Sequence, residues 1–231
     1  LLTLDRPEAR NAIPAAGWAA LEARIGEAAR SEARVLLLAG AGEAFCAGAD
    51  LGDFPAMQGD ADATADFRRA MRGAIVALRE LAMPTVAAIH GPCFGAGVAL
   101  AMACDLRIAG RAARFAITPA KFGISYPQED IASLVALVGP GHAARLLFTA
   151  ETIDAEEAKA IGLVERVDPT GGGEGVAAAI AANAGESLVT LKRGLRLASE
   201  GRRSDAEQDR AFDALVSGDE LARRLVALRG K

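Results

Sequence analysis

The sequence predicts an α/β protein with a helical C-terminal region, and three observations lead to this prediction. Residues 85–106 read as a buried strand, a glycine-rich turn and an apolar helix. Residues 35–51 repeat the first part of this arrangement, an apolar strand followed by a loop of small residues. Beyond residue 175 every segment has the spacing of a helix.

The composition is that of a globular chain large enough to bury a substantial core. The 231 residues are 52% hydrophobic and 24% charged, which excludes an intrinsically disordered chain. The net charge of −4 gives no basic surface for nucleic acid, and we see no uninterrupted apolar run of membrane-spanning length. Three irregularly spaced cysteines indicate a reducing, cytoplasmic compartment, and two histidines are too few for a His-rich metal site.

The N-terminal third is predicted to alternate strands and helices. Residues 1–4 and 35–39 are expected to be strands, and residues 14–29 an amphipathic helix that begins at a proline. Residues 52–63 are polar and contain glycine, which predicts a mobile flap. A second helix is expected over residues 65–81 and ends before Pro84.

The central segment carries the strongest local signal for function. Residues 85–90 are expected to form a buried strand, followed by a tight turn, a helix over 98–104 and a strand over 106–109. The first N–H groups of a helix have no partner within it, and the helix dipole adds partial positive charge there. The tip near Gly95 and Ala96 is therefore suited to hold an oxygen that carries or develops negative charge.

The segments that follow are shorter. The pattern predicts a strand at 115–118, an irregular passage at 119–127, helices at 131–138 and 141–148, and a strand at 163–164. Asp154 with Glu157 indicates the start of another helix.

Residues 170–175 form a glycine-rich linker, so we predict a core over 1–169 and a helical region over 170–231. Helices are expected at 176–183, 188–199 and 206–216, with a last one to about residue 228, and Ser204 with Glu207 resembles a capping box.

Three stretches together resemble the crotonase, or enoyl-CoA hydratase/isomerase, family. They are the span 86–106 with its Gly95-Ala96-Gly97 triplet, the sequence AFCAGADL at 44–51, and LDRPEARNA at 4–12. The resemblance implies a ClpP-like ββα spiral core and a C-terminal helical region that makes a homotrimer or a dimer of trimers. It also implies an acyl-CoA thioester as substrate, with coenzyme A entering as part of the substrate and no separate cofactor.

The resemblance also assigns residues to the site. Its two backbone N–H donors for the thioester oxygen fall on Ala49 and Ala96. It makes Arg6 a candidate contact for the CoA phosphates, the alternative being a solvated surface arginine. The remaining expected substrate contacts are Ala47, Asp50, Leu51 and Gly95, with Asp50 expected to fix its loop rather than to transfer protons.

The chain departs from the family at both usual acid/base glutamates, where it has Ala99 and Pro119. Tyr126 is either a buried ring with a satisfied hydroxyl or a chemical group, because its surroundings resemble those of a tyrosine in methylmalonyl-CoA decarboxylase. Glu129 and Asp130 are either helix first-turn acids or a replacement base. The sequence thus leaves three functions open: a hydratase/isomerase, an acyl-CoA decarboxylase, or a catalytically silent acyl-CoA-binding subunit.

Overall fold

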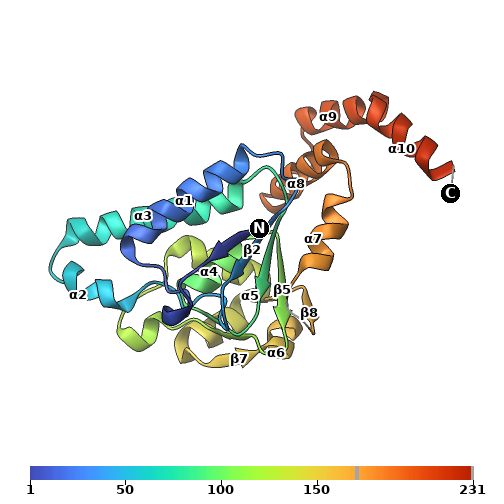
Figure 1. Cartoon of the computed structure of the whole chain (residues 1–231). Helices are drawn as coiled ribbons and strands as arrows, with labels where there is room; N and C mark the ends of the chain where they lie inside the picture. Colours follow the sequence, from blue (N-terminus) through green and yellow to red (C-terminus); the bar gives the residue numbers. More distant parts are fainter. Residues whose placement is uncertain (170–171, 230–231) are drawn as a thin grey trace.

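The computed structural model describes residues 1–169 and 172–229 and shows two β-sheets surrounded by helices (Figure 1). The larger sheet is parallel in the pairs β1–β2, β2–β3, β3–β5 and β5–β8. Its strands are Leu2–Leu4 (β1), Leu36–Gly40 (β2), Thr85–Ile89 (β3), Leu106–Gly110 (β5) and Arg166–Asp168 (β8). The smaller sheet pairs β4 (Pro92–Phe94) in parallel with β6 (Arg114–Ala116), and β6 antiparallel with β7 (Thr152–Asp154).

The helices account for most of the described chain. In the core they are α1 (Ala15–Ala29), α2 (Phe54–Met57), α3 (Ala61–Glu80), α4 (Ala96–Ala103), α5 (Gln128–Thr149) and α6 (Ala155–Ala160). After the predicted linker come α7 (Glu174–Ala181), α8 (Gly185–Ser199), α9 (Ala206–Ser217) and α10 (Asp219–Arg229). Three short 3-10 helices are η1 (Pro7–Ala9), η2 (Leu51–Asp53) and η3 (Pro119–Phe122).

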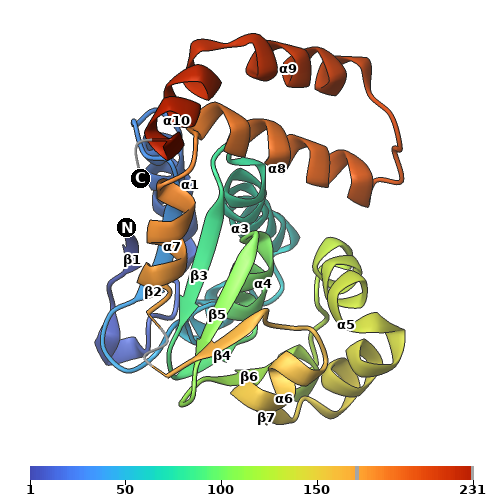
Figure 2. The same cartoon turned by 90° about the vertical axis from the view of Figure 1, so that its right-hand side faces the viewer.

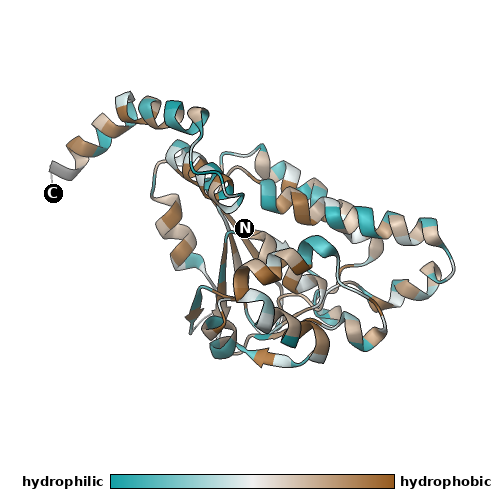
Figure 3. Cartoon of the chain, turned by 180° about the vertical axis from the view of Figure 1, so that it is seen from behind, coloured by the Kyte–Doolittle hydropathy of each residue, from teal (hydrophilic) through white to brown (hydrophobic). Residues whose placement is uncertain are grey.

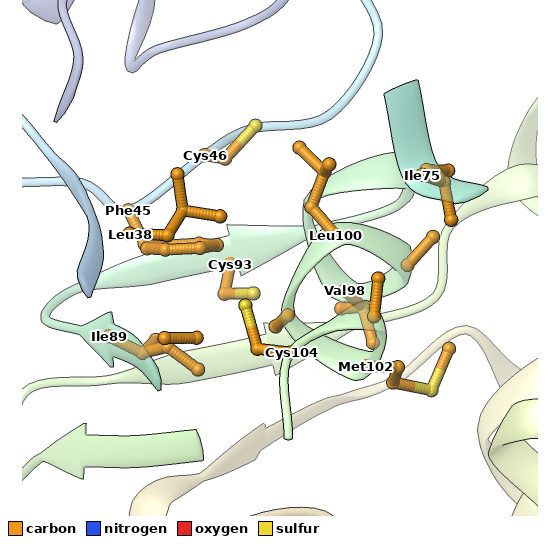
Figure 4. Close-up of a cluster of buried hydrophobic side chains, with 14 of the residues drawn as sticks. Leu38, Phe45, Cys46, Ile75, Ile89, Cys93, Val98, Leu100, Met102 and Cys104 are labelled. Atoms are coloured by element: carbon orange, nitrogen blue, oxygen red, sulfur yellow. The ribbon is translucent and has the colours of Figure 1, made fainter. Parts of the chain in front are cut away.

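The core lies between the larger sheet and the helices α1, α3 and α4. Every residue of β3 is buried, as expected for a central parallel strand that is covered on both faces. Seven of the eight residues of α4 are buried, which explains why this helix is apolar on all sides. Figure 4 shows part of this cluster, with Leu38 and Ile89 from the sheet and Val98 and Leu100 from α4.

The other face of the larger sheet is covered by α7, which lies along β2 and β3 (Figure 2). Val176, Ala177 and Ile180 pack there on Val86 and Ile108. The predicted boundary at residue 170 falls at residues 170–171, which lie outside the described residues, and it stays a prediction.

Helix α8 lies at the end of the larger sheet, and α9 and α10 extend away from the core (Figures 1 and 3). Neither α8 nor α9 has a buried residue, and large apolar side chains such as Leu195 and Phe212 are exposed. Lys192 anchors α8 to the core, since its Nζ lies 2.7 Å from a carboxylate oxygen of Asp105 and donates to the Met83 carbonyl at 3.0 Å.

Several local predictions are wrong. The segment 52–63 is mostly helical, in η2, α2 and the start of α3, where Asp60 accepts from the Ala63 N–H, and its predicted mobility stays a prediction. The strand expected at 163–164 forms instead as β8, and the glycine turn contains β4. Asp205, not Ser204, caps α9 by accepting from the Gln208 N–H, and Glu207 pairs with Arg193.

The two helices expected at 131–138 and 141–148 lie within α5, which is broken at Gly139, where φ is 74° and ψ 163°, next to Pro140. By length and apolar composition alone, α5 could cross a membrane. The break leaves neither half with the ~20 residues that a span needs. Leu134, Val138 and Leu146 instead bury their side chains in the core.

Candidate active site

Two loops, residues 44–51 after β2 and residues 91–97 after β3, lie side by side at the carboxyl ends of their strands. The Cys46 N–H donates to the Pro92 carbonyl at 3.1 Å, and the Phe94 N–H donates to the Cys46 carbonyl at 2.9 Å. These hydrogen bonds continue the parallel pairing of the sheet into the loops. They explain why two segments almost fifty residues apart meet at the start of α4.

Glycine is required at two points of this contact. A Cβ atom on Gly97 would lie 2.4 Å from the Cys46 carbonyl oxygen. Gly48 has a φ of +102°, and a Cβ there would lie 2.8 Å from the Phe94 carbonyl oxygen and 3.1 Å from the Ala96 nitrogen. The loop thus approaches the first N–H of α4 more closely than any residue with a side chain would allow.

The N–H groups of Ala49 and Ala96 have no acceptor within the described chain. Ile13 donates to the Gly48 carbonyl at 2.8 Å and accepts from the Asp50 N–H at 2.9 Å. In this extended backbone the Ala49 N–H points away from Ile13. Ala96 is the first residue of α4, so its N–H has no partner inside the helix and carries the positive end of the dipole.

Both alanines line one cavity with a volume of about 640 Å³. The sequence-predicted residues Ala47, Asp50, Leu51, Gly95, Tyr126 and Asp130 line it too, whereas Arg6 and Glu129 do not. Its apolar wall comes from side chains of α2, α3, η3 and the segment after η3, namely Phe54, Phe67, Met71, Phe122 and Ile124. This wall could accept an alkyl chain, and local sequence patterns had not singled out any of its members.

Arg6, the candidate contact for the CoA phosphates, is engaged by Asp50 of the loop 44–51. Its guanidinium forms an ion pair with Asp50, and its backbone N–H donates to Asn11 Oδ1 at 2.9 Å. The hydrogen bond from Arg6, together with that from the Gly52 N–H, lowers the pKa of Asp50. Asp50 therefore stays ionised and fixes its loop, as expected for it.

Arg10 lines the cavity instead, and it makes no ion pair within residues 1–169 or 172–229. It has a left-handed backbone, with φ at 50°, where η1 ends. Arg10 belongs to the same LDRPEARNA stretch as Arg6, so the motif could have pointed to either arginine.

Tyr126 is buried, and its hydroxyl donates to the Gly95 carbonyl oxygen at 2.9 Å. Burial, followed by the nearby charge of Asp130, raises the pKa of Tyr126 well above its ordinary value. The phenol therefore keeps its proton at neutral pH, and its hydrogen bond is satisfied inside the protein. Its ring still contributes to the cavity wall.

Glu129 and Asp130 are neighbours in the first turn of α5, but they have different surroundings. The Glu129 side chain is 64% exposed, and that of Asp130 is 1% exposed. Arg72 of α3 pairs with both, its Nη1 donating to Asp130 Oδ1 at 2.5 Å. The second oxygen of Asp130, Oδ2, is buried without a hydrogen-bond partner in the described chain.

Burial raises the pKa of Asp130, and the charge of Arg72 partly opposes this effect. A carboxyl group with a raised pKa and one oxygen without a hydrogen-bond partner, on a residue of the cavity wall, has the properties of a group that accepts and returns protons. The only acidic side chains on the described cavity wall are Asp50 and Asp130. Both are paired with an arginine, but the pKa of Asp50 is lowered, whereas that of Asp130 is raised and its Oδ2 has no partner in the described chain.

The positions of the two missing glutamates contribute no charge. Ala99 is buried in α4 and does not line the cavity, and Pro119 begins η3 on the cavity wall. The acidic group thus reaches the cavity from the start of α5 instead.

Comparisons with known proteins agree with the resemblance seen in the sequence. Residues 1–214 match the family described as Enoyl-CoA hydratase/isomerase. A Mycobacterium bovis protein named "Probable enoyl-CoA hydratase" is 38% identical over 192 residues, which cover 83% of this chain and 76% of that protein. A short-chain-enoyl-CoA hydratase from Clostridium acetobutylicum is 34% identical over 228 residues, which cover 95% of this chain and 84% of that protein.

Among solved structures, an enoyl-CoA hydratase/isomerase family protein from Hyphomonas neptunium superimposes with a TM-score of 0.91 at 34% identity, covering 99% of this chain and 90% of that one. An enoyl-CoA hydratase/carnitine racemase from Magnetospirillum magneticum gives a TM-score of 0.90 at 30% identity, covering 99% and 88%. The predicted α/β fold of the crotonase type is thereby confirmed.

Proposed function

The chain belongs to the enoyl-CoA hydratase/isomerase family, and we propose that it is an enzyme that holds the enolate of an acyl-CoA thioester between the N–H groups of Ala49 and Ala96. The observation that carries the proposal is the close packing at Gly48 and Gly97, which brings two amides without acceptors to one cavity. Donors that are fixed before the reaction stabilise a developing oxyanion at no cost of reorganisation.

The side chains of the cavity wall indicate where the acyl chain and the CoA phosphates of the substrate bind. The apolar side chains of α2, α3, η3 and the segment after η3 accept the acyl chain. Arg10 is the cation that we assign to the CoA phosphates, because it is not neutralised by a carboxylate, as Arg6 is.

We assign proton transfer to Asp130, and this assignment favours isomerisation over hydration. Water addition in the usual form divides its work between two carboxyl groups, and this cavity offers one. For a 3-enoyl thioester, the Asp130 carboxylate takes the proton from C2, and the resulting dienolate places its negative charge on the thioester oxygen. The protonated carboxyl then gives the proton to C4, so that the double bond moves to the 2,3 position and Asp130 is regenerated.

The decarboxylase alternative has less support from the geometry. In that reaction Tyr126 would bind the substrate carboxylate, but its hydroxyl already donates to Gly95. A substrate carboxylate near Tyr126 would also meet the charge of Asp130, which is close enough to affect the phenol.

The experiment supplies the purified protein with a 3-enoyl-CoA, crotonyl-CoA and methylmalonyl-CoA, and follows conjugation by ultraviolet absorbance and products by mass. We expect turnover of the 3-enoyl-CoA, and an Asp130→Asn variant that loses about 10²–10⁴-fold in kcat. Glu129→Gln is the matched control, since it changes the adjacent, exposed carboxylate and should keep most of the activity.

Other outcomes identify the alternatives. Turnover of methylmalonyl-CoA alone indicates the decarboxylase, and tight binding of all three thioesters without turnover indicates a silent subunit. Full activity of Asp130→Asn, with an unchanged melting temperature, would reject Asp130 as the proton carrier.

We also propose a homotrimer or a dimer of trimers in the cytoplasm. The exposed apolar side chains of α8, α9 and α10 support a role for these helices in assembly. The buried, unpaired thiols of Cys46, Cys93 and Cys104 support a reducing compartment. Light scattering of the purified protein measures the oligomeric state directly.

A further inference from the structure

The peptide group between Gly95 and Ala96 has hydrogen-bonding roles on both of its ends. Its N–H is the one that belongs to Ala96 at the start of α4. Its carbonyl oxygen, on Gly95, accepts the Tyr126 hydroxyl at 2.9 Å, the Val98 N–H at 2.9 Å and the Ala99 N–H at 3.4 Å. Tyr126 thus touches the same peptide unit as the proposed substrate oxygen, but from the opposite end.

This peptide is held in an unusual conformation. Gly95 has φ at 51° and ψ at −121°, which residues with a side chain rarely adopt. Its N–H donates to the Ala116 carbonyl at 2.9 Å, which ties the residue to β6. That bond fixes one side of Gly95, and the Tyr126 hydroxyl is the side-chain donor that fixes the plane of the following peptide.

A hydrogen bond to a carbonyl oxygen also changes the N–H of the same peptide. It draws electron density from nitrogen to oxygen through the resonance of the amide, so the N–H becomes a stronger donor. The Tyr126 phenol is protected from ionisation by its burial, so the hydroxyl always donates here.

We propose that Tyr126 is a positioning residue, which orients and polarises the Gly95–Ala96 peptide so that the Ala96 N–H binds the thioester oxygen more strongly. This inference rests on the proposed oxyanion site at Ala49 and Ala96. It gives Tyr126 a role without contact to the reacting carbons, unlike proton transfer or binding of a substrate carboxylate.

The test is the stretching frequency of the thioester carbonyl in a bound saturated acyl-CoA, labelled with carbon-13 and measured by infrared difference spectroscopy. In the wild-type protein we expect a lower frequency than in free acyl-CoA. Tyr126→Phe should lose part of this lowering, and kcat should fall roughly two- to tenfold, as for the loss of one hydrogen bond, with little change in KM.

Thr85→Val is the control for the loss of a buried hydroxyl, because the Thr85 hydroxyl donates to Asp105 at the start of β3. This variant should leave the carbonyl frequency unchanged. Tyr126 is the chain's single tyrosine, so growth on 3-fluorotyrosine modifies this position alone. The more acidic fluorophenol is a stronger donor and should lower the carbonyl frequency further. This second measurement decides the question if the Tyr126→Phe protein does not fold.

The outcomes separate the two proposals. If bound acyl-CoA shows no lowering in the wild-type protein, the oxyanion site itself is wrong. If the wild type lowers the frequency, and Tyr126→Phe and the fluorotyrosine protein give the same value as the wild type, the oxyanion site stands and the role of Tyr126 is rejected.

Discussion

The loops 44–51 and 91–97 and the passage 118–130 line the same cavity, but they contribute to it in different ways. The loops offer backbone N–H groups, and their side chains only have to be small enough for Gly48 and Gly97 to pack. The passage offers side chains, among them the Tyr126 hydroxyl, which donates to Gly95, and the Asp130 carboxyl group, whose Oδ2 has no partner in the described chain. The loops keep the family pattern, whereas the passage departs from it at Pro119.

This difference shows where the chemistry of the family can vary. A backbone donor does not depend on the identity of its side chain, so the proposed oxyanion site is compatible with alanine at both donor positions. A proton carrier depends on one carboxyl group, and its position can move along the chain when another residue faces the same cavity. Four experiments test this division, beginning with the largest expected effect.

The first removes a backbone donor without changing the side chain. Replacing Ala96 by lactic acid keeps the methyl group and turns the amide into an ester without N–H. The loss of one oxyanion donor should lower kcat by about 10²–10³-fold. Steady-state kinetics with the best acyl-CoA substrate gives the result, and the same replacement at Ala49 should have a similar effect. If the ester at one position leaves kcat unchanged, the N–H that it replaces does not bind the oxyanion in the wild-type protein.

The second removes the cation that faces Asp130. Arg72→Leu leaves a carboxyl group that is 1% exposed without its charge partner, and should destabilise the protein by about 3 kcal/mol. The pKa of Asp130, already raised by burial, should rise further because the opposing effect of Arg72 is lost. Arg69→Leu, on the exposed side of the same helix, is the control.

The expected pH dependence follows from this shift. A carboxyl group with a raised folded-state pKa binds its proton more tightly in the folded than in the unfolded protein. Its contribution to the free energy of unfolding is therefore present at low pH and is lost as the pH rises through the folded-state pKa. In Arg72→Leu the loss of stability should extend to higher pH, and the acid limb of kcat/KM should move to higher pH. Thermal melts across the acid range measure the stability, and rate profiles over the same range measure the acid limb. An unchanged acid limb would mean that Asp130 does not control the rate.

The third follows the ionisation of the only tyrosine by ultraviolet difference spectroscopy. Because burial raises the folded-state pKa of Tyr126 well above its ordinary value, the native protein should show no phenolate at pH values where the unfolded chain already does. Stability should then decline as the pH rises toward the folded-state pKa. Titration of the native protein at the ordinary pKa would show that the hydroxyl is accessible to water and not held by Gly95.

The fourth should have the smallest effect. Ala49→Ser and Ala96→Ser keep the backbone N–H and add one polar atom, so kcat should change by less than about threefold, in line with mild substitutions. Steady-state kinetics of both variants gives the comparison with the ester proteins. A large loss in the serine variants would show that the side chains of these loops matter as much as their backbone.

The sequence by itself determined the fold class and the backbone part of the site. Apolar strands followed by glycine and alanine loops, with small residues at 48 and 97, are local features, because each reflects a backbone conformation or a close approach that only a small residue permits. They predicted β2, β3, β5 and α4 within a few residues, and the family resemblance pointed to Ala49 and Ala96, which line one cavity.

Only the tertiary structure decided which polar side chains near the cavity are buried, paired or exposed, because burial and charge pairing depend on residues far apart in the chain. Glu129 and Asp130 are adjacent and equally acidic, yet the orientation of the first turn of α5 and the place of Arg72 on α3 expose one and bury the other. Arg6 and Arg10 share one motif, but Asp50, more than forty residues away, engages only Arg6. The partner of Tyr126, a carbonyl oxygen 31 residues earlier, likewise follows from packing, which no local pattern of residues encodes.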